Sequence, residues 1–287
     1  MELLTTDGFK DYELLDSGDG RRLERFGEFV LDRPDPQVIW KKGDVALWSK
    51  ASAFFERTSG DNGKWIQNIP IPEKWQIHYK NLTFWVKLTP FKHTGLFPEQ
   101  ETQWSLLEDK ILNSKREVNV LNLFGYTGAM SLVAAKVGAK VTHVDASKPA
   151  VTWANENREL NKMQDSPIRW IVDDALDFVN REIKRENKYD IVIMDPPAYG
   201  HGPTGGVWEF NKDFPKLLEA TRNVLSDNPI LVLVNAYAIS SSSTTLANTM
   251  ADYFSDIKGV IKNGELNIKE KSKGRLLSTG IYSTWES

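Results

Sequence analysis

An acidic residue followed by two prolines ends an apolar run, in the segment Asp195-Pro196-Pro197-Ala198-Tyr199. Two prolines in this position fix a rigid, extended loop. We expect the loop to direct the Asp195 carboxylate and the Pro196 carbonyl at one point, with Tyr199 stacked on a flat substrate. Two acceptors bound to the N–H groups of an amine on an aromatic ring restore its nucleophilic lone pair, which suits methylation of that amine. We therefore predict Asp195, Pro196, Pro197 and Tyr199 as the catalytic residues.

A glycine-containing turn follows an earlier strand-like run, where Asn122-Leu123-Phe124 leads into Gly125-Tyr126-Thr127-Gly128. Glycines at such a turn let a ligand approach the backbone, and the next helix offers free N–H groups and a positive dipole end. The spacing is G-x-x-G, which differs from the G-x-G-x-x-G of dinucleotide binders and lacks the Lys-Ser/Thr pair of a P-loop. The turn predicts a binding site for a carboxylate or a phosphate.

Carboxylates end the next two strand-like runs. Asp145 comes 20 positions after Gly125, a spacing suited to binding ribose hydroxyls. Asp173 and Asp174 follow the third run, where a carboxylate can accept a hydrogen bond from an adenine amine. The carboxyl ends of parallel strands meet at one edge of the sheet, which is where such folds bind ligands. The order of these groups therefore predicts one nucleoside-type site.

The elements that position these residues follow from the apolar pattern. The first ninety residues are β-rich, and strands then alternate with helices, which is typical of a doubly wound α/β sheet. The expected early strands are 10–15, 21–31, 37–41, 44–49, 75–79 and 82–88, with a hairpin turn at 16–20. The expected later strands are 118–124, 140–145, 168–172, 189–194 and 230–235. The expected helices are 98–114, 128–137, 149–163, 174–186, 213–225 and 244–254, and the first buries Trp104, Leu107, Ile111 and Leu112. Runs 265–271 and 276–285 predict a terminal hairpin.

We therefore predict a Rossmann-like, mostly parallel seven-stranded sheet with a terminal antiparallel hairpin, plus a small β-rich N-terminal domain. The expected domains are 1–88 and 89–287. The chain has 287 residues, 40% hydrophobic and 26% charged, which is typical of a globular protein. The first ten residues include Glu2 and Asp7, so we expect no secretory signal there, and no apolar run is long enough for a membrane helix. We expect a cytoplasmic protein that does not bind membranes.

Cysteine is absent and there are four histidines, none of them in an H-x-x-x-H pair, so we expect no metal site. The formal net charge is −3, and neither the first ninety residues nor the remainder is basic as a whole. Any nucleic acid must therefore bind to a local patch. Ten tryptophans are present; they could form stacking platforms, although core packing is the interpretation we favour.

These motifs resemble motifs I to IV of the class I S-adenosylmethionine-dependent methyltransferases. In addition, the segment 89–100 resembles the H-K-T-G-x-x-x-D-Q element of bacterial large-subunit rRNA methyltransferases, with Glu99 in place of the aspartate. That element covers the cofactor in the family, which includes uncharacterised relatives of the rRNA enzymes. The resemblance spans about residues 89–287, and the N-terminal part does not resemble the RNA-binding PUA domain of some members.

The resemblance implies S-adenosylmethionine as the cofactor. The residues expected to bind it are Thr94, Phe97, Gln100, Asn122, Phe124, Gly125, Tyr126, Thr127, Gly128, Asp145, Ala146, Asp173, Asp174 and Ala175. Some members of the family methylate C5 of cytosine with a cysteine thiolate, a route closed to a chain without cysteine.

A base amine in RNA, and rRNA in particular, is the acceptor we expect. A protein glutamine or a small planar amine is the alternative, favoured by the acidic pI of about 5.9 and by the absent PUA domain. A nicotinamide-dependent oxidoreductase and a non-catalytic cofactor-binding protein fit the motifs less well. The sequence leaves open the modified position, the oligomeric state and the role of the N-terminal part.

Overall fold

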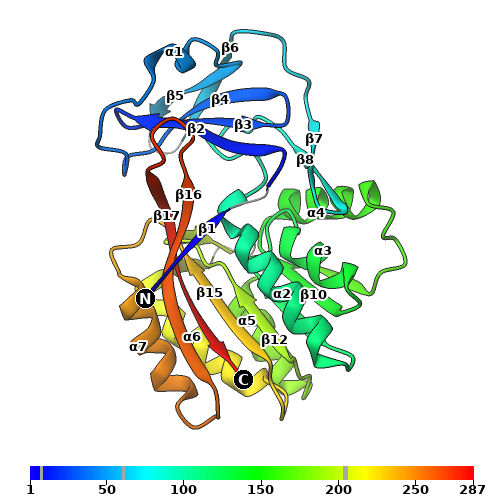
Figure 1. Cartoon of the computed structure of the whole chain (residues 1–287). Coiled ribbons are helices and arrows are strands. Elements are labelled where there is room, and N and C mark those ends of the chain that lie inside the picture. Colours follow the sequence, from blue (N-terminus) through cyan, green and yellow to red (C-terminus); the bar gives the residue numbers. More distant parts are fainter. Residues whose placement is uncertain (7–8, 60–61, 203–205) are drawn as a thin grey trace. The chain divides into compact units, whose positions relative to one another are not determined.

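The computed structural model describes residues 1–6, 9–59, 62–202 and 206–287 of the chain (Figure 1). The chain divides into two compact units. The larger comprises Met1–Leu4, Thr102–Leu266 and Thr279–Ser287, and the smaller comprises Thr5–Glu101 and Asn267–Ser278. The smaller unit therefore takes in the tip of the terminal hairpin as well as the N-terminal part of the chain. The division into a β-rich domain over 1–88 and a second domain over 89–287 remains a prediction.

One sheet of eight strands, in the order β1-β16-β17-β15-β12-β9-β10-β11, forms the core of the larger unit. Neighbouring strands from β11 to β15 run parallel, and β17 pairs antiparallel with β15. The bounds are Glu2–Thr6 (β1), Asn119–Leu123 (β9), Lys140–Asp145 (β10), Ile168–Val172 (β11), Ile191–Met194 (β12), Leu231–Ala236 (β15), Val260–Lys269 (β16) and Leu276–Glu286 (β17). This arrangement confirms the predicted Rossmann-like fold with its terminal antiparallel strands.

The prediction of seven strands was wrong by one, because β1 joins the outer edge beside β16. The first strand was missed because its pattern is weak. Glu2 and Leu3 are exposed, and the remaining three residues of β1 are only half-buried. An edge strand that buries so little has no strict alternation of apolar and polar residues, so the period on which strand prediction depends is absent.

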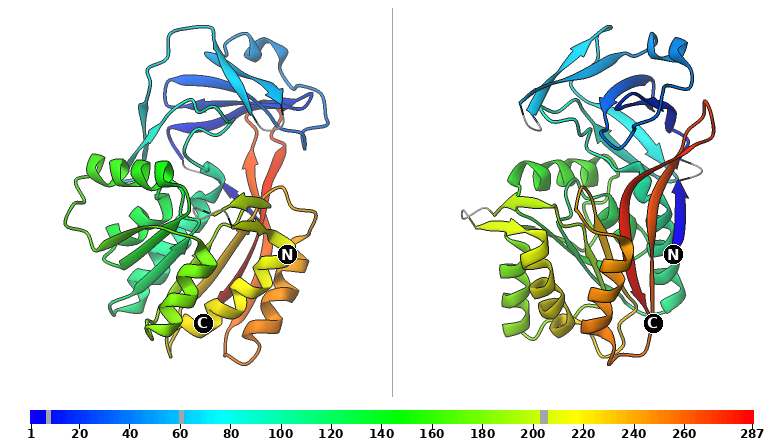
Figure 2. Two further views of the ribbon diagram at one scale, coloured as in Figure 1. Left: turned by 180° about the vertical axis from the view of Figure 1, so that it is seen from behind. Right: turned by 90° about the vertical axis from the view of Figure 1, so that its left-hand side faces the viewer.

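Helices cover both faces of the sheet (Figures 1 and 2). The bounds are Glu101–Ser114 (α2, preceded by a 3₁₀ turn at Pro98–Gln100), Ala129–Lys136 (α3), Lys148–Leu160 (α4), Ala175–Lys184 (α5), Phe210–Val224 (α6) and Ser243–Phe254 (α7). The helices α5, α6 and α7 lie side by side on one face, and α2, α3 and α4 lie on the other. Alternate strand residues such as Leu123, Met194 and Val234 pack against the first group. None of the described helices combines the length and hydrophobicity needed to cross a bilayer.

The helix predicted over 98–114 is present, but one residue of its predicted buried face is wrong. Trp104, Leu107 and Ile111 are buried, whereas Leu112 is 59% exposed. The first three follow the i, i+3, i+7 spacing of one helix face, and Leu112 lies about 100° further around the axis. An apolar residue next to such a face was therefore assigned to it in error.

The smaller unit contains a five-stranded sheet in the order β2-β3-β4-β5-β6 and a separate hairpin, β7-β8. The bounds are Tyr12–Gly18 (β2), Arg21–Phe26 (β3), Phe29–Pro34 (β4), Ala53–Ser59 (β5), Asn62–Gln67 (β6), Trp75–Tyr79 (β7), Leu82–Val86 (β8) and Val45–Trp48 (α1). The predicted turn between β2 and β3 is confirmed, with Asp19 and Gly20 both at positive φ, as a two-residue hairpin turn of this type requires.

Three predictions for this unit were wrong. The stretch 44–49 contains the helix α1. Asp44 caps the N-terminus of this helix by accepting a hydrogen bond from the Ala46 N–H. The stretch 37–41 contains no strand. The run 21–31 is interrupted by a tight turn at Gly27, whose φ of 63° favours glycine. Sequence analysis also missed the hairpin formed by β5 and β6.

Candidate functional site

The predicted motifs of the larger unit lie at the carboxyl ends of adjacent strands. β9 is paired with β10 on one side and with β12 on the other. The chain therefore leaves β9 at the switch point of the strand order, where open α/β sheets bind ligands. The loop 124–128 follows β9, Asp145 ends β10, Asp173 follows β11, and the segment 195–199 follows β12. Four of the predicted groups thus share one edge of one sheet.

The loop after β9 turns sharply through three residues at positive φ. These are Phe124 at 55°, Tyr126 at 50° and Gly128 at 86°. The loop is held by the Gly125 N–H, which donates to the Val144 carbonyl at 3.0 Å, and by the Gly128 N–H, which donates to the Gly125 carbonyl at 3.0 Å. Strained backbone at non-glycine residues of this kind clusters at ligand sites. The loop is therefore a preformed, rigid feature of the edge.

The two glycines of this loop are needed for packing inside the protein, whereas the sequence predicted that they let a ligand approach the backbone. A Cβ on Gly125 would lie 2.4 Å from the Cε1 atom of His143, and one on Gly128 would lie 2.9 Å from the Cβ of Ala154. Gly125 thus leaves room for a β10 side chain beneath the loop, and Gly128 lets α4 pack closely. Helix-to-strand packing is an established use of glycine in such turns.

A buried polar chain supports the loop from below. The Asn122 amide donates to the Ser131 hydroxyl at 2.9 Å, and that hydroxyl lies 2.9 Å from Nδ1 of His143. All three residues are buried, and burial lowers the pKa of His143 to about 3. The side chain of Asn122, a residue predicted to bind the cofactor, is therefore engaged in this row of hydrogen bonds. Sequence analysis missed Ser131 and His143, which carry no recognisable motif.

Asp145 is tied to two loops through its carboxylate. One oxygen accepts from the Tyr126 N–H at 2.8 Å, and the other accepts from the Ser147 N–H at 2.8 Å. Burial raises the pKa of Asp145, and the two backbone hydrogen bonds oppose this shift. Each carboxylate oxygen has more than one lone pair, so both can still accept from a ligand hydroxyl. Ala146, the next predicted residue, is half-buried.

The residues after β11 have distinct environments. Asp173 forms an ion pair with Arg181 and accepts from the Asp174 N–H at 2.9 Å. Asp174 caps α5, because its Oδ1 accepts from the Asp177 N–H at 3.0 Å, while its Oδ2 accepts no hydrogen bond from the described residues. Ala175 is buried in the core. Of the three predicted residues, Asp174 therefore has the carboxylate oxygen best able to take a further donor.

The segment after β12 is fixed through its carbonyl groups. The Pro197 carbonyl accepts from the indole N–H of Trp208 at 2.7 Å, and the Ala198 carbonyl accepts from the Phe210 N–H at 3.1 Å. Among the described residues, no N–H or O–H donates to the Pro196 carbonyl. The Asp195 N–H is 3.4 Å from the Leu123 carbonyl, which joins this segment to the end of β9. One carbonyl next to Asp195 is thus left available.

Trp208 is a residue that sequence analysis did not assign to the site. Its ring is buried and packs edge-on against Phe124, with the ring centroids 5.1 Å apart. It lies in β14 (Val207–Glu209), which pairs with β13 (Tyr199–His201). Trp208 and Tyr199 are not opposite each other in this register, and Tyr199 is 56% exposed. Tyr199 therefore has an exposed ring on the hairpin that begins directly after the two prolines.

The three predicted residues before the larger unit, Thr94, Phe97 and Gln100, belong to the smaller unit. Thr94 and Gln100 are buried, and the Thr94 hydroxyl has no hydrogen-bond partner among the described residues. Phe97 lies 5.5 Å from His93 between ring centroids, in a tilted arrangement. Thr127, in contrast, lies in the larger unit, and its carbonyl accepts from Asn157 at 2.9 Å.

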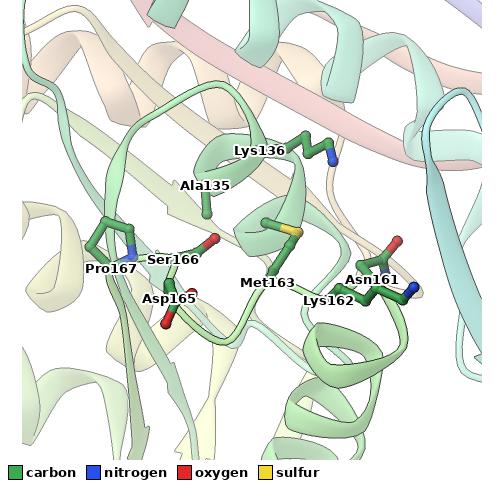
Figure 3. A pocket seen from close by; sticks show the side chains of 8 residues that line it. All are labelled: Ala135, Lys136, Asn161, Lys162, Met163, Asp165, Ser166 and Pro167. Carbon is green, nitrogen blue, oxygen red and sulfur yellow. The ribbon is translucent and has the colours of Figure 1, made fainter.

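A hollow of about 450 Å³ lies away from this edge (Figure 3). It is lined by the end of α3, the end of α4 and the approach to β11, which places it at the amino ends of the strands. Its lining residues are Ala135, Lys136, Asn161, Lys162, Met163, Asp165, Ser166 and Pro167. None of these is a predicted site residue.

Comparison with known proteins identifies the family. Residues 53–253 match the model of the S-adenosylmethionine-dependent methyltransferases. A ribosomal RNA large subunit methyltransferase K/L of Pseudoalteromonas atlantica is 30% identical over 191 residues, which are 66% of this chain and 24% of that protein. The chain thus spans about a quarter of the length of this curated relative.

Two solved structures have the same fold. A methyltransferase from Agrobacterium tumefaciens has a TM-score of 0.96 and is 38% identical, with 100% of this chain and 93% of that chain covered. The protein SMU.776, solved as a complex with SAH, has a TM-score of 0.76 and is 22% identical, with 97% of this chain and 76% of that chain covered. The family model covers well over half of the chain and includes the whole of the site described above. The chain therefore belongs to the S-adenosylmethionine-dependent methyltransferases.

Proposed function

We propose that this enzyme methylates an amine nitrogen of a base in RNA, and of ribosomal RNA in particular. The observation that carries the proposal is the arrangement after β12. The Pro197 and Ala198 carbonyls are already bound by donors, whereas the Pro196 carbonyl beside Asp195 accepts none from the described residues. Two acceptors, one from a side chain and one from the backbone, are what an exocyclic amine needs.

The residues at this edge of the sheet fit S-adenosylmethionine. Asp145 is half-buried, and both of its oxygens retain lone pairs for the ribose hydroxyls. Asp174 has a carboxylate oxygen for the adenine amine, and the loop 124–128 leads into the N-terminus of α3, which suits the carboxylate of the amino acid part. When bound, the cofactor supplies an electrophilic methyl group on a sulfonium.

Attack on that methyl is an in-line displacement, so the protein must mainly position the acceptor and restore its lone pair. The lone pair of an amine on an aromatic ring is delocalised into the ring. Hydrogen bonds from its two N–H groups to the Asp195 carboxylate and the Pro196 carbonyl favour a tetrahedral nitrogen, which recovers the nucleophilic pair. Tyr199, with its exposed ring, stacks on the base once the base has left its helix.

Two further observations support RNA as the substrate and nitrogen as the acceptor. The curated relative acts, by its name, on the large-subunit ribosomal RNA. The chain has no cysteine, and methylation of cytosine C5 by the thiolate route requires one. The proposal therefore excludes 5-methylcytosine as the product. It also places the enzyme in the cytoplasm, where ribosomal RNA is found.

A protein glutamine or a small planar amine is the second candidate. The net charge of −3 favours it, because the chain as a whole does not attract a polyanion. The chemistry at Asp195 and Pro196 is the same for both acceptors, since each presents a delocalised amine. The substrate is therefore the point that an experiment must decide.

Mass spectrometry of nucleosides from the ribosomal RNA of a deletion strain tests this proposal. We expect one N-methylated nucleoside to be missing and to return when the wild-type gene is restored. Asp195→Ala should fail to restore it although the purified variant still binds S-adenosylmethionine. A deletion strain with unchanged RNA nucleosides contradicts the RNA substrate, and loss of 5-methylcytosine contradicts the chemistry. Full restoration by Asp195→Ala removes Asp195 from the catalytic set.

A further inference from the structure

A pair of buried carboxylates joins the tip of the terminal hairpin to the N-terminal sheet within the smaller unit. Asp16 accepts from the Gly43 N–H at 3.0 Å, from the Trp48 indole at 2.7 Å and from the Ser272 hydroxyl at 2.6 Å. Glu270 accepts from Arg275 at 2.9 Å. The backbone of the tip continues this connection, since the Lys271 N–H donates to the Leu14 carbonyl at 2.9 Å.

These contacts make the tip of β16 and β17, the loop before α1 and β2 one rigid surface, and Figure 1 draws the tip beside β2. Both carboxylates are buried, and hydrogen bonds hold the pKa of each below its usual range against the effect of burial. The guanidinium of Arg275 is held within this arrangement, because it also donates hydrogen bonds to the carbonyls of Lys41 and Ser17. The charges of Asp16 and Glu270 are therefore satisfied inside this region, whereas Asp19 and Asp44 stay exposed beside it.

The lysines of the same two segments point outward. Lys41, Lys269, Lys271 and Lys273 are exposed. Lys271 pairs with Glu13 at 3.0 Å, whereas Lys41, Lys269 and Lys273 form no ion pair with the described residues. We call these four lysines together with Lys42 the basic tip surface. It is a local excess of positive charge on a chain with a net charge of −3.

Two tryptophans lie within this surface in fixed orientations. The Trp48 indole donates to Asp16, and its ring carries the Lys42 ammonium 3.9 Å from the ring centroid. The Trp40 indole donates to the Ser17 hydroxyl at 3.1 Å, and Arg275 lies 5.6 Å from its ring centroid. Both rings are half-buried. Aromatic rings interleaved with cations are the combination that binds single-stranded nucleic acid.

We infer that the basic tip surface binds the phosphate backbone of the RNA substrate. This inference rests on the proposed function, and it assigns to the smaller unit the role of holding RNA. A phosphate at every nucleotide presents charge at regular intervals, which matches lysines spread over two separate segments. The rigid support beneath the lysines lowers the entropy lost when RNA binds. An RNA contact at this surface contributes affinity without reading the base sequence.

Binding is measured without methylation, by fluorescence anisotropy of a labelled single-stranded RNA of mixed sequence at several salt concentrations. The test variant changes Lys41, Lys269 and Lys273 together to glutamine, which keeps a flexible polar side chain and removes three charges. We expect RNA affinity to fall about tenfold or more, and the salt dependence of log K to weaken by about 0.7 for each lost contact. The affinity for S-adenosylhomocysteine should stay unchanged, because none of these residues is a predicted cofactor ligand.

A matched triple variant, in which Lys10, Lys184 and Lys258 become glutamine, removes the same charge from exposed positions elsewhere. It should retain the affinity and salt dependence of the wild type. If both variants weaken RNA binding equally, the effect belongs to net charge and the inference is wrong, while the proposed function stands. If the wild type binds no RNA but binds poly-glutamate at this surface, both the inference and the RNA substrate are wrong.

Discussion

The indole N–H of Trp208 donates a hydrogen bond to the Pro197 carbonyl at 2.7 Å, and the same ring packs edge-on against Phe124. One side chain therefore links the segment after β12 to the strained loop after β9. By occupying the second proline's carbonyl, it fixes the peptide plane that follows the Pro196 carbonyl. Trp208 is a positioning residue in this arrangement, because it acts on the acceptor site through Pro197.

Trp208→Phe removes the donor and keeps an aromatic ring against Phe124. We expect the activation free energy of methyl transfer to rise by about 0.5–1.5 kcal/mol, the net value of one hydrogen bond. The rate should therefore fall about two- to tenfold. The affinity for S-adenosylmethionine should change little. Steady-state kinetics and calorimetry on the same preparation measure the two effects separately.

Trp285→Phe is the matched control, because Trp285 is also buried and its indole N–H has no partner among the described residues. It should leave the rate unchanged. Equal losses in the two variants would mean that ring size, and not the hydrogen bond to Pro197, determines the effect.

Asp145→Ala should weaken binding of S-adenosylmethionine by about 1.5–3 kcal/mol, the usual range for hydrogen bonds to a charged group. The carboxylate also accepts from the backbone of Tyr126 and Ser147, so part of the loss arises from the loop. Asp145→Asn keeps the shape and one acceptor, and should lose less than the alanine variant. Calorimetry on folded protein measures both, and unchanged affinity in the alanine variant removes Asp145 from the cofactor site.

Much of the fold could be predicted from the sequence because buried parallel strands are continuous apolar runs. The predicted strands 189–194 and 230–235 come within two residues of the bounds of β12 and β15, which are buried throughout. The method failed where burial is slight or the pattern is short. β1 is an edge strand, and α1 has no buried residue. A four-residue helix without a buried face leaves no helical period in the sequence.

The site was predictable only in those parts that lie next to strand ends in the sequence. Asp145 ends β10, Asp174 lies two residues after β11 and Asp195 directly follows β12, so the fold class alone brings them to one edge. Trp208 and His143 act on residues that are distant in the sequence, and pairing of that kind leaves no local pattern. For Trp208 the only available signal was a tryptophan shortly after the two prolines. For His143 there was none beyond a lone histidine within a strand.

His143 predicts a specific dependence of stability on pH. Its pKa is about 3 in the folded protein, against about 6.5 in an unfolded chain. The unfolded state therefore binds more protons below pH 6.5, and the free energy of unfolding falls as the pH drops from about 6.5 toward 3. The slope from this one group reaches at most about 1.4 kcal/mol per pH unit. Well above pH 6.5 this group has no effect, because it is then neutral in both states.

Chemical denaturation at pH 7 and pH 5 measures this contribution, with His143→Gln as the comparison. The wild type should lose more stability than the variant between these two values, because the carboxylates titrate in both proteins and only the histidine is missing from one. Equal losses would show that His143 can be protonated without unfolding the chain. Such a result would also mean that His143 can gain a proton while it is buried beneath Gly125.

Tyr199 predicts a separation between acceptor and cofactor. Its ring is 56% exposed on the hairpin that follows the two prolines, and Ala198 separates it from Pro197. If the acceptor is a base, Tyr199→Ala should cost about 1–3 kcal/mol, the range for stacking of a base on an aromatic ring. The loss should appear in kcat/KM for the RNA, because the ring holds the acceptor. Cofactor affinity should stay close to that of the wild type, and Tyr199→Phe should retain most of the activity, because stacking needs the ring and not the hydroxyl.

If Tyr199→Phe loses as much activity as Tyr199→Ala, the role belongs to the hydroxyl group instead. If Tyr199→Ala weakens cofactor binding as much as turnover, the ring faces the cofactor and the base must be held by other residues.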